Sequence, residues 1–132
     1  MGFQPLSEQI ERIGRSIVDS AFTVHTNLGP GLLEKVYEKC MVEELRLRNI
    51  YVERQVPVPI VYKGAEIDED LKIDILVEHE IIVELKAVEV MHPVFDAQLL
   101  TYLKLTNRKL GYLINFNVPL IKDGIKRLRR NS

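Results

Sequence analysis

The sequence predicts an α/β fold in which a mixed β-sheet of four to five strands is flanked by α-helices. Apolar residues recur at helical spacing in the N-terminal third of the chain, which is typical of helices that bury one face. The middle of the chain alternates apolar and polar residues, as half-buried strands do. A further helical segment precedes residues 110–116, which are almost wholly apolar and fit a strand covered on both faces.

Two helices are expected before the first strand. Ser7 is placed to cap the first helix, and the glycines and proline of residues 29–31 end it. Asn49 is a suitable end for the second helix. The expected apolar stripe of the first helix is Ile10, Ile13, Ile17, Ala21, Val24 and Leu28, and that of the second is Leu33, Val36, Tyr37, Cys40, Met41 and Leu45.

Strands are expected at residues 51–62, 65–77 and 81–88. Pro57 and Pro59 remove two donors from the same edge of the first strand, which predicts an edge strand or an irregular one. The second and third strands form a hairpin around the loop Glu78-His79-Glu80. A helix at residues 94–106 follows Pro93, and residues 121–128 can add a short last strand.

The hairpin is expected to bring two acidic side chains face to face. Cross-strand partners share a face, so the three-residue loop pairs Ile75 with Val83 and sets Asp74 opposite Glu84, with Ile73 and Ile75 on the same face. Such carboxylates, with Cβ atoms roughly 5 Å apart, repel each other unless a divalent cation lies between them. Lys86 lies two residues along the same face, which predicts a Mg²⁺ site beside a cation that can face a phosphate. A solvated sheet face on which the lysine screens both acids is the structural alternative.

Three short motifs resemble those of one nuclease superfamily. Asp74 followed by Glu84-Leu85-Lys86 resembles the signature of the PD-(D/E)XK superfamily, which has the restriction-endonuclease-like fold. Gly31-Leu32-Leu33-Glu34-Lys35-Val36-Tyr37 resembles the defining motif of its GxxExxY branch, and Gln98-Leu99-Leu100-Thr101-Tyr102 resembles the QxxxY helix motif of its exonuclease-like branches. The resemblance runs from about Ile10 to Arg127, with Ile73 where the superfamily's name has proline.

The resemblance implies one restriction-endonuclease-like domain over residues 1–132 and a metal-dependent nuclease that hydrolyses phosphodiester bonds. The implied ligands of Mg²⁺, or of Mn²⁺ in its place, are Glu34, Asp74, Glu84 and the main-chain carbonyl of Leu85. Lys86 would orient or deprotonate the attacking water, and Gln98 and Tyr102 would position the scissile group. The implied partner is nucleic acid, with DNA favoured over RNA.

Several of these residues also have structural interpretations. Glu34 in the first turn of a helix interacts favourably with the helix dipole. Gln98 and Tyr102 lie one turn apart and can form a polar surface stripe. Asp70 shares a face with Asp74 and is an additional ligand candidate, and His92 follows the Glu-Leu-Lys strand closely enough to be a candidate for substrate contact.

Composition limits the kinds of partner. A net charge of −1 argues against a protein that coats nucleic acid through bulk electrostatics. The basic C-terminal residues are either phosphate contacts or a solubilising end; they are Lys122, Lys126, Arg127, Arg129 and Arg130. The single cysteine, Cys40, fits a reducing compartment and is expected to be a small core residue.

The expected location is cytoplasmic, without contact to a membrane. No apolar run approaches the length of a membrane span, and the N-terminal residues lack the basic and apolar regions of a secretory signal. The alternative to a nuclease is a binding or assembly module that keeps the fold without the chemistry. Small size and near-zero net charge favour a chain that acts in a homo-oligomer or a larger complex.

Overall fold

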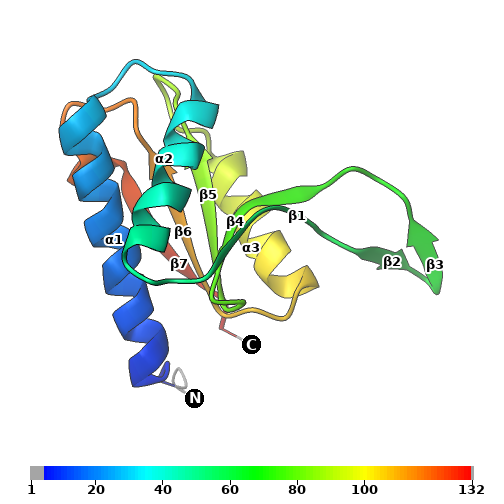
Figure 1. Cartoon of the computed structure of the whole chain (residues 1–132). Coiled ribbons are helices and arrows are strands. Elements are labelled where there is room, and N and C mark those ends of the chain that lie inside the picture. Colours follow the sequence, from blue (N-terminus) through cyan, green and yellow to red (C-terminus); the bar gives the residue numbers. More distant parts are fainter. Residues whose placement is uncertain (1–4, 132) are drawn as a thin grey trace.

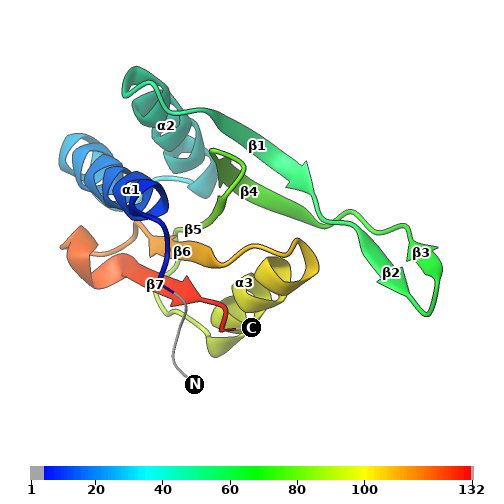
Figure 2. The same cartoon turned by 90° about the horizontal axis from the view of Figure 1, so that it is seen from below.

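Three layers make up the structure, with a five-stranded sheet between two helices on one face and one helix on the other (Figures 1 and 2). The computed structural model describes residues 5–131. The helices are α1 (Glu8–Leu28), α2 (Glu34–Leu47), α3 (Pro93–Leu105) and a short 3₁₀ helix, η1 (Ile121–Gly124). The strands are β1 (Val52–Pro57), β2 (Ile60–Tyr62), β3 (Ala65–Ile67), β4 (Lys72–Val77), β5 (Ile81–Lys86), β6 (Leu110–Asn115) and β7 (Ile125–Arg129).

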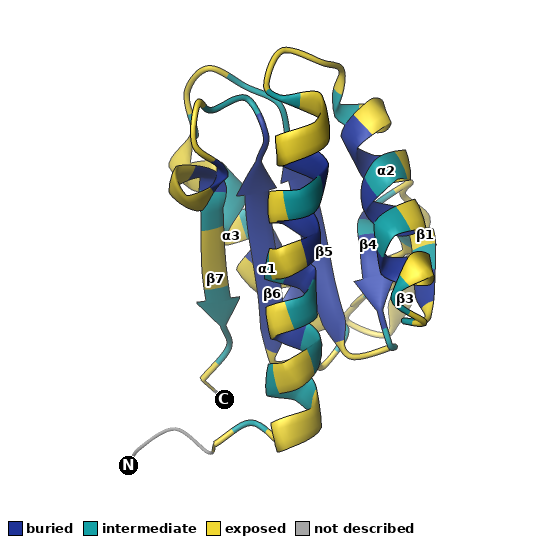
Figure 3. Ribbon diagram, turned by 60° about the vertical axis from the view of Figure 1, so that its left-hand side comes forward, coloured by how far each residue is buried: buried dark blue, intermediate teal, exposed yellow. Residues whose placement is uncertain are grey.

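The main sheet is mixed and has the strand order β1-β4-β5-β6-β7. Only β5 and β6 pair in parallel, because α3 connects them as a crossover, and the other neighbours are antiparallel. Strands β5 and β6 are buried along almost their whole length (Figure 3). The predicted α/β fold, with a restriction-endonuclease-like arrangement of helices on a mixed sheet, is confirmed.

Helices α1 and α2 cover one face of the sheet. The side chain of Ser7 accepts a hydrogen bond from the N–H of Ile10 at 3.1 Å, so the predicted cap is present. The predicted stripe of α2 is wrong at its start, because Leu33 precedes the helix and is 76% exposed and Val36 is 37% exposed. The buried face is rotated toward the next residues in the helix; it comprises Tyr37, Glu38, Met41, Val42 and Leu45.

The two prolines divide the first predicted strand. Strand β1 ends at Pro57 and is an edge strand of the main sheet, as predicted. The chain then leaves the sheet as the arm, residues 59–70, in which β2 and β3 pair only with each other (Figure 2). The N–H of Val58 donates to the carbonyl of Leu71 at 2.8 Å and closes the base of the arm. The predicted strand at residues 65–77 is therefore two strands, β3 and β4.

The β4–β5 hairpin has the predicted register, with Ile75 opposite Val83 and Val77 opposite Ile81. The prediction that Ile73 and Ile75 share a face of the sheet is wrong. Ile75 packs in the core under α1 and α2, whereas Ile73 packs in the core under α3. The residue between them, Asp74, forms no ladder pair with either neighbouring strand, so the regular alternation of β4 is interrupted there.

The chain completes the sheet after α3. Strand β6 lies between β5 and β7, and its residues are all buried, as predicted for a covered strand. The first four residues of the predicted last strand form η1, and β7 covers the rest. Within residues 5–131, no helix combines the length and the apolar character needed to cross a membrane.

Candidate active site

Asp74 and Glu84 are tied to each other's strands. The N–H of Asp74 donates to Oε2 of Glu84 at 2.8 Å, and the N–H of Leu85 donates to Oδ2 of Asp74 at 2.9 Å. These bonds replace the backbone pair that would otherwise continue the ladder beyond Ile75 and Val83. Each carboxylate uses one oxygen in this way, and its second oxygen takes no part in these two bonds.

Both carboxyl groups are hard to ionise. Burial, and next the charge of Asp74, raise the pKa of Glu84 to about 8, and the Glu84 residue is 5% exposed. Burial also raises the pKa of Asp74, against the lowering effect of the Leu85 N–H. The ammonium of Lys86 lowers both pKa values but does not offset the burial. The pair is therefore an acidic site in which burial and mutual repulsion oppose the ionisation of both groups.

Glu34 lies close to this pair from the first turn of α2. Burial, and next the charge of Asp74, raise the pKa of Glu34. The position of α2 is fixed by Tyr37, whose hydroxyl donates to the carbonyl of Gly29 at 2.6 Å and accepts from the N–H of Leu32 at 3.1 Å. The ring of Tyr37 stacks on that of Phe116 with centroids 4.5 Å apart. Tyr37 thereby anchors the loop from which Glu34 emerges.

Helix α3 supplies the other side of the site. The Gln98 amide donates to the Tyr102 hydroxyl at 3.1 Å. Burial, and next the charge of Glu84, raise the pKa of Tyr102, which is 4% exposed. Tyr102 is therefore buried near the acids, and the alternative of an exposed polar stripe does not hold for it. Phe95, in the first turn of α3, lies 4.4 Å from the ammonium of Lys86.

Two residues of the site were not predicted from the sequence, Glu38 and Gln55. Glu38 is 3% exposed and accepts hydrogen bonds from Gln55 and from Arg54. Two weak signals point to them. Glu38 follows Glu34 by one helical turn, and the run Glu53-Arg54-Gln55 interrupts the alternation of its strand.

Other candidates lie in different surroundings. Asp70 is exposed and pairs with Lys72 at 3.3 Å. His92 caps α3, because its Nδ1 accepts from the N–H of Val94 at 3.1 Å. His25, which was not a candidate, is buried near the end of α1 and contacts the carbonyl of Val118 at 2.8 Å. None of these three contacts involves Asp74 or Glu84.

The basic C-terminal residues lie mainly on β7, at the opposite edge of the sheet from β1. Lys126 pairs with Asp96 at 2.7 Å, and Arg127 pairs with Glu11 at 3.0 Å. These pairs join β7 to α3 and α1. These two residues therefore belong to an ordered strand with acidic partners, and both interpretations of the basic C-terminal residues stay predictions.

Glu34, Asp74 and Glu84, together called the acid cluster, offer oxygen donors that suit a hard divalent cation. Within residues 5–131, no three Asp, Glu, His or Cys side chains form a ready-made metal cage. The acid cluster nevertheless offers carboxylate oxygens whose ionisation is opposed by burial and by each other. Oxygen donors of this kind are those that Mg²⁺ and Mn²⁺ prefer, and a bound cation would relieve the repulsion. The carboxylates that can supply such oxygens are Glu34, Asp74 and Glu84, and ligation by the carbonyl of Leu85 stays a prediction.

The comparison with known families agrees with this arrangement. The sequence matches the family model described as the PD-(D/E)XK nuclease superfamily over residues 11–128. No curated protein and no solved structure matches the chain. The family match covers strands β1 to β6, most of β7 and nearly all of the helices, including the hairpin that carries the acids. The chain therefore belongs to the PD-(D/E)XK nuclease superfamily.

Proposed function

We propose that this protein is a Mg²⁺-dependent nuclease that hydrolyses phosphodiester bonds of nucleic acid. The observation that carries the proposal is the pair Asp74 and Glu84, in which the buried Glu84 and the half-buried Asp74 are each hydrogen-bonded to the strand of the other, beside Lys86. Holding two acids together against their repulsion costs stability, and a bound divalent cation recovers that cost. Membership of a nuclease superfamily supports the same chemistry.

The residues have separate roles in this proposal. Asp74, Glu84, Glu34 and the carbonyl of Leu85 hold Mg²⁺, with Mn²⁺ as a substitute. The ion, when bound, polarises a phosphoryl oxygen and lowers the pKa of its water. Lys86 then orients the attacking water or balances the negative charge that develops on the phosphate.

The Gln98–Tyr102 pair positions the scissile group in this proposal. Its hydrogen bond fixes the phenol hydroxyl near Glu84, so the pair presents defined polar atoms at the α3 side of the site. Positioning of a phosphate by fixed groups accelerates hydrolysis without any covalent intermediate on the protein.

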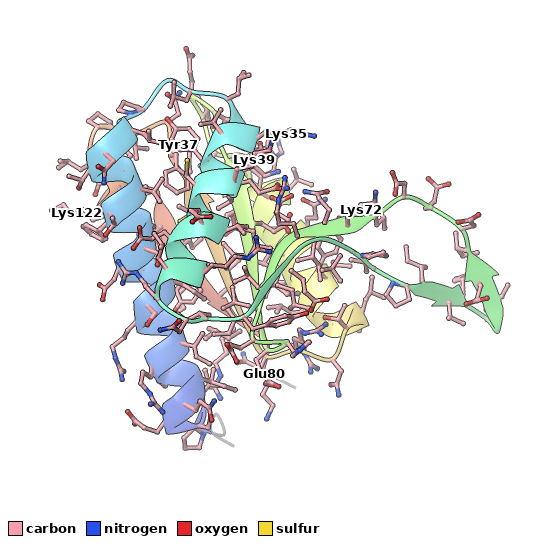
Figure 4. The ribbon with its side chains drawn as sticks, in the orientation of Figure 1. Lys35, Tyr37, Lys39, Lys72, Glu80 and Lys122 are labelled. Carbon is pink, nitrogen blue, oxygen red and sulfur yellow. The ribbon has the colours of Figure 1, made fainter. Side chains whose placement is uncertain are left out.

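Exposed lysines can contact the nucleic-acid backbone beside the acids. Lys35 and Lys39 are exposed on α2 and project toward the side where β4 and the arm begin, and Lys72 lies at the base of the arm (Figure 4). Such ammonium groups bind phosphates without reading sequence. The substrate we propose is nucleic acid, with DNA favoured over RNA.

The second candidate is a binding or assembly module that has the nuclease fold without the chemistry. It is favoured by the hydrogen bonds between the carboxylates and backbone N–H groups, which satisfy one oxygen of each acid without any metal. The same fold serves many functions, so family membership alone does not separate the two candidates.

The test is cleavage of a panel of end-labelled oligonucleotides in Mg²⁺, Mn²⁺ or EDTA. The panel contains single- and double-stranded DNA and RNA, so that the products report both the substrate and whether cutting is internal or terminal. We expect cleavage only with metal, and its loss in Asp74→Asn and Glu84→Gln. Glu80→Gln is the matched control, because Glu80 is an exposed acid in the loop of the same hairpin, at the opposite end of the strands (Figure 4).

The melting temperature, measured with and without metal, separates the candidates if no cleavage is seen. A cation that binds only the folded protein must raise the melting temperature. If Mn²⁺ stabilises the wild type but not Glu84→Gln, the proposed metal site is supported. Other nucleic-acid substrates are then tested for cleavage. Absence of both cleavage and metal stabilisation rejects the nuclease and favours the binding module.

A further inference from the structure

Gln55 occupies an interruption of the sheet directly opposite Asp74. The β1–β4 ladder pairs Arg54 with Ile75 and Val56 with Ile73, but it does not pair Gln55 with Asp74. The φ angle of Gln55 is +52°, in the left-handed region that residues other than glycine adopt at an energetic cost. Such a conformation persists where the surroundings determine it, so the contacts of its side chain need an explanation.

The first contact of Gln55 is a buried carboxylate. Its Nε2 donates to Oε1 of Glu38 at 2.9 Å. The other oxygen of Glu38, Oε2, accepts from Nε of Arg54 at 2.9 Å and lies 2.7 Å from Nη2 of the same guanidinium. Both oxygens of Glu38 are thus committed to β1, so Glu38 is a fixed point for the strand and is not free to ligate a metal.

Asp74 is the second acid on which Gln55 acts. The Gln55 side chain favours the charged form of the Asp74 carboxylate and so lowers its pKa, as the N–H of Leu85 also does. A primary amide carries two N–H bonds, so one group can serve Glu38 and Asp74 at once. A donor from β1 can in this way act on the Asp74 carboxylate beside the donor from β5, the N–H of Leu85.

We propose that Gln55 is a positioning residue that transmits the fixed orientation of Glu38 to Asp74. The left-handed backbone at Gln55 aims the amide between these two acids. With Glu38 held by Arg54, the amide keeps Asp74 oriented toward the metal position. This inference rests on the proposed function for the identity of the metal, but the orientation of Asp74 can be measured without one.

The matched variants separate positioning from backbone strain. Gln55→Gly removes the amide and relieves the left-handed backbone, and this relief offsets part of the cost of leaving Oε1 of Glu38 without its donor. Gln55→Met keeps the length of the side chain without a donor. Asn49→Gly is the control, because Asn49 also has a positive φ, +61°, but lies at the end of α2 without contact to the acids.

The metal-free readout is the Leu85 amide, measured by NMR as its chemical shift and its hydrogen-exchange rate. We expect Gln55→Gly and Gln55→Met to shift this amide and speed its exchange, because the Asp74 carboxylate that accepts from it becomes mobile. Asn49→Gly should leave it unchanged. An unaltered Leu85 amide in both Gln55 variants overturns the inference, whatever the metal does.

The second readout is the affinity for Mn²⁺, measured by titration calorimetry. We expect binding about 10- to 100-fold weaker in both Gln55 variants, the usual loss when a residue that orients a metal ligand is removed. Equal affinity in wild type and variants overturns the inference and leaves the proposed function intact. Failure of the wild type to bind any metal overturns the nuclease proposal, and the Leu85 amide alone then decides whether Gln55 orients Asp74.

Discussion

The ammonium of Lys86 lies 4.4 Å from the centre of the Phe95 ring, over its face. Within residues 5–131, none of the ion pairs includes Lys86, although this lysine acts electrostatically on both acids. The aromatic ring attracts the cation without neutralising it, so the charge stays available to a phosphate. Phe95 therefore holds Lys86 in place next to the acids.

We predict that Phe95→Leu lowers the rate of phosphodiester cleavage. A cation–π contact is worth about 0.5–2 kcal/mol, which corresponds to about 2- to 30-fold in the single-turnover rate constant if the lysine loses its position. Phe95→Tyr keeps the ring face and should retain the rate. The two variants are compared in single-turnover cleavage assays, and equal rates in Phe95→Leu and Phe95→Tyr would contradict the role of the ring.

The stability of the metal-free protein should fall as the pH rises toward 8. Burial, and next the charge of Asp74, raise the pKa of Glu84 from 4.5 to about 8, so the folded protein binds a proton there that the unfolded chain has released. The stabilisation is complete below pH 4.5 and is lost as the pH passes through 8. At about 1.4 kcal/mol per pKa unit, the loss is on the order of a few kcal/mol.

Urea denaturation in EDTA between pH 5 and pH 8.5 measures this effect. Glu84→Gln cannot ionise, so its stability should change less with pH and exceed that of the wild type at pH 8.5. Saturating Mn²⁺ should stabilise the wild type most at high pH, where the carboxylate is ionised, and should have little effect on Glu84→Gln. A wild type and a variant with parallel pH profiles would show that Glu84 does not carry the shift.

Replacing Lys35 and Lys39 by alanine should weaken nucleic-acid binding equally for all sequences. Each phosphate contact contributes about 0.9 to the slope of log K against log salt for duplex DNA, so the double variant should reduce that slope by about 2. Lys122→Ala is the control, because Lys122 is an exposed lysine on the opposite side of the molecule (Figure 4). Fluorescence anisotropy at several salt concentrations gives the slopes. An equal change in the Lys122 variant would point to a general charge effect.

Tyr37→Phe should destabilise the protein by about 1–3 kcal/mol, because it leaves the Gly29 carbonyl and the Leu32 N–H without their partner. The stacking on Phe116 is kept, so the fold should persist. The change is measured by urea denaturation. Tyr62→Phe removes the hydroxyl of a tyrosine that is 62% exposed, and it should have almost no effect on stability. Similar losses in the two variants would contradict the anchoring role of Tyr37.

Alternation and motif spacing predicted the hairpin register and the proximity of its acids, because both follow from side chains that alternate along paired strands. The same rule failed between Ile73 and Ile75, since it assumes an unbroken ladder. The sequence alone does not show that two acids will take hydrogen bonds from the opposite backbone and thereby open that ladder.

The contribution of Glu38 was hidden for a different reason. A charged residue on a helix is normally assigned to the solvent, and Glu38 is buried only because Arg54 and Gln55 reach it from β1. That contact depends on how α2 docks against an edge strand, which local periodicity does not encode. Partners from distant parts of the chain therefore made up most of what sequence reasoning missed at the site.

The hydrogen bond from Val58 to Leu71 separates the arm from the rest of the architecture. Residues 59–70 leave and rejoin the sheet at one junction, which this hydrogen bond closes. A short reverse turn could therefore replace them while β1 and β4 remain paired. Loops of very different size, or a grafted recognition peptide, can thus be exchanged at this junction without dismantling the sheet. Leu71, at this junction, lies three residues before Asp74. Changes in the length or sequence of the arm can therefore alter which molecules contact the acidic site.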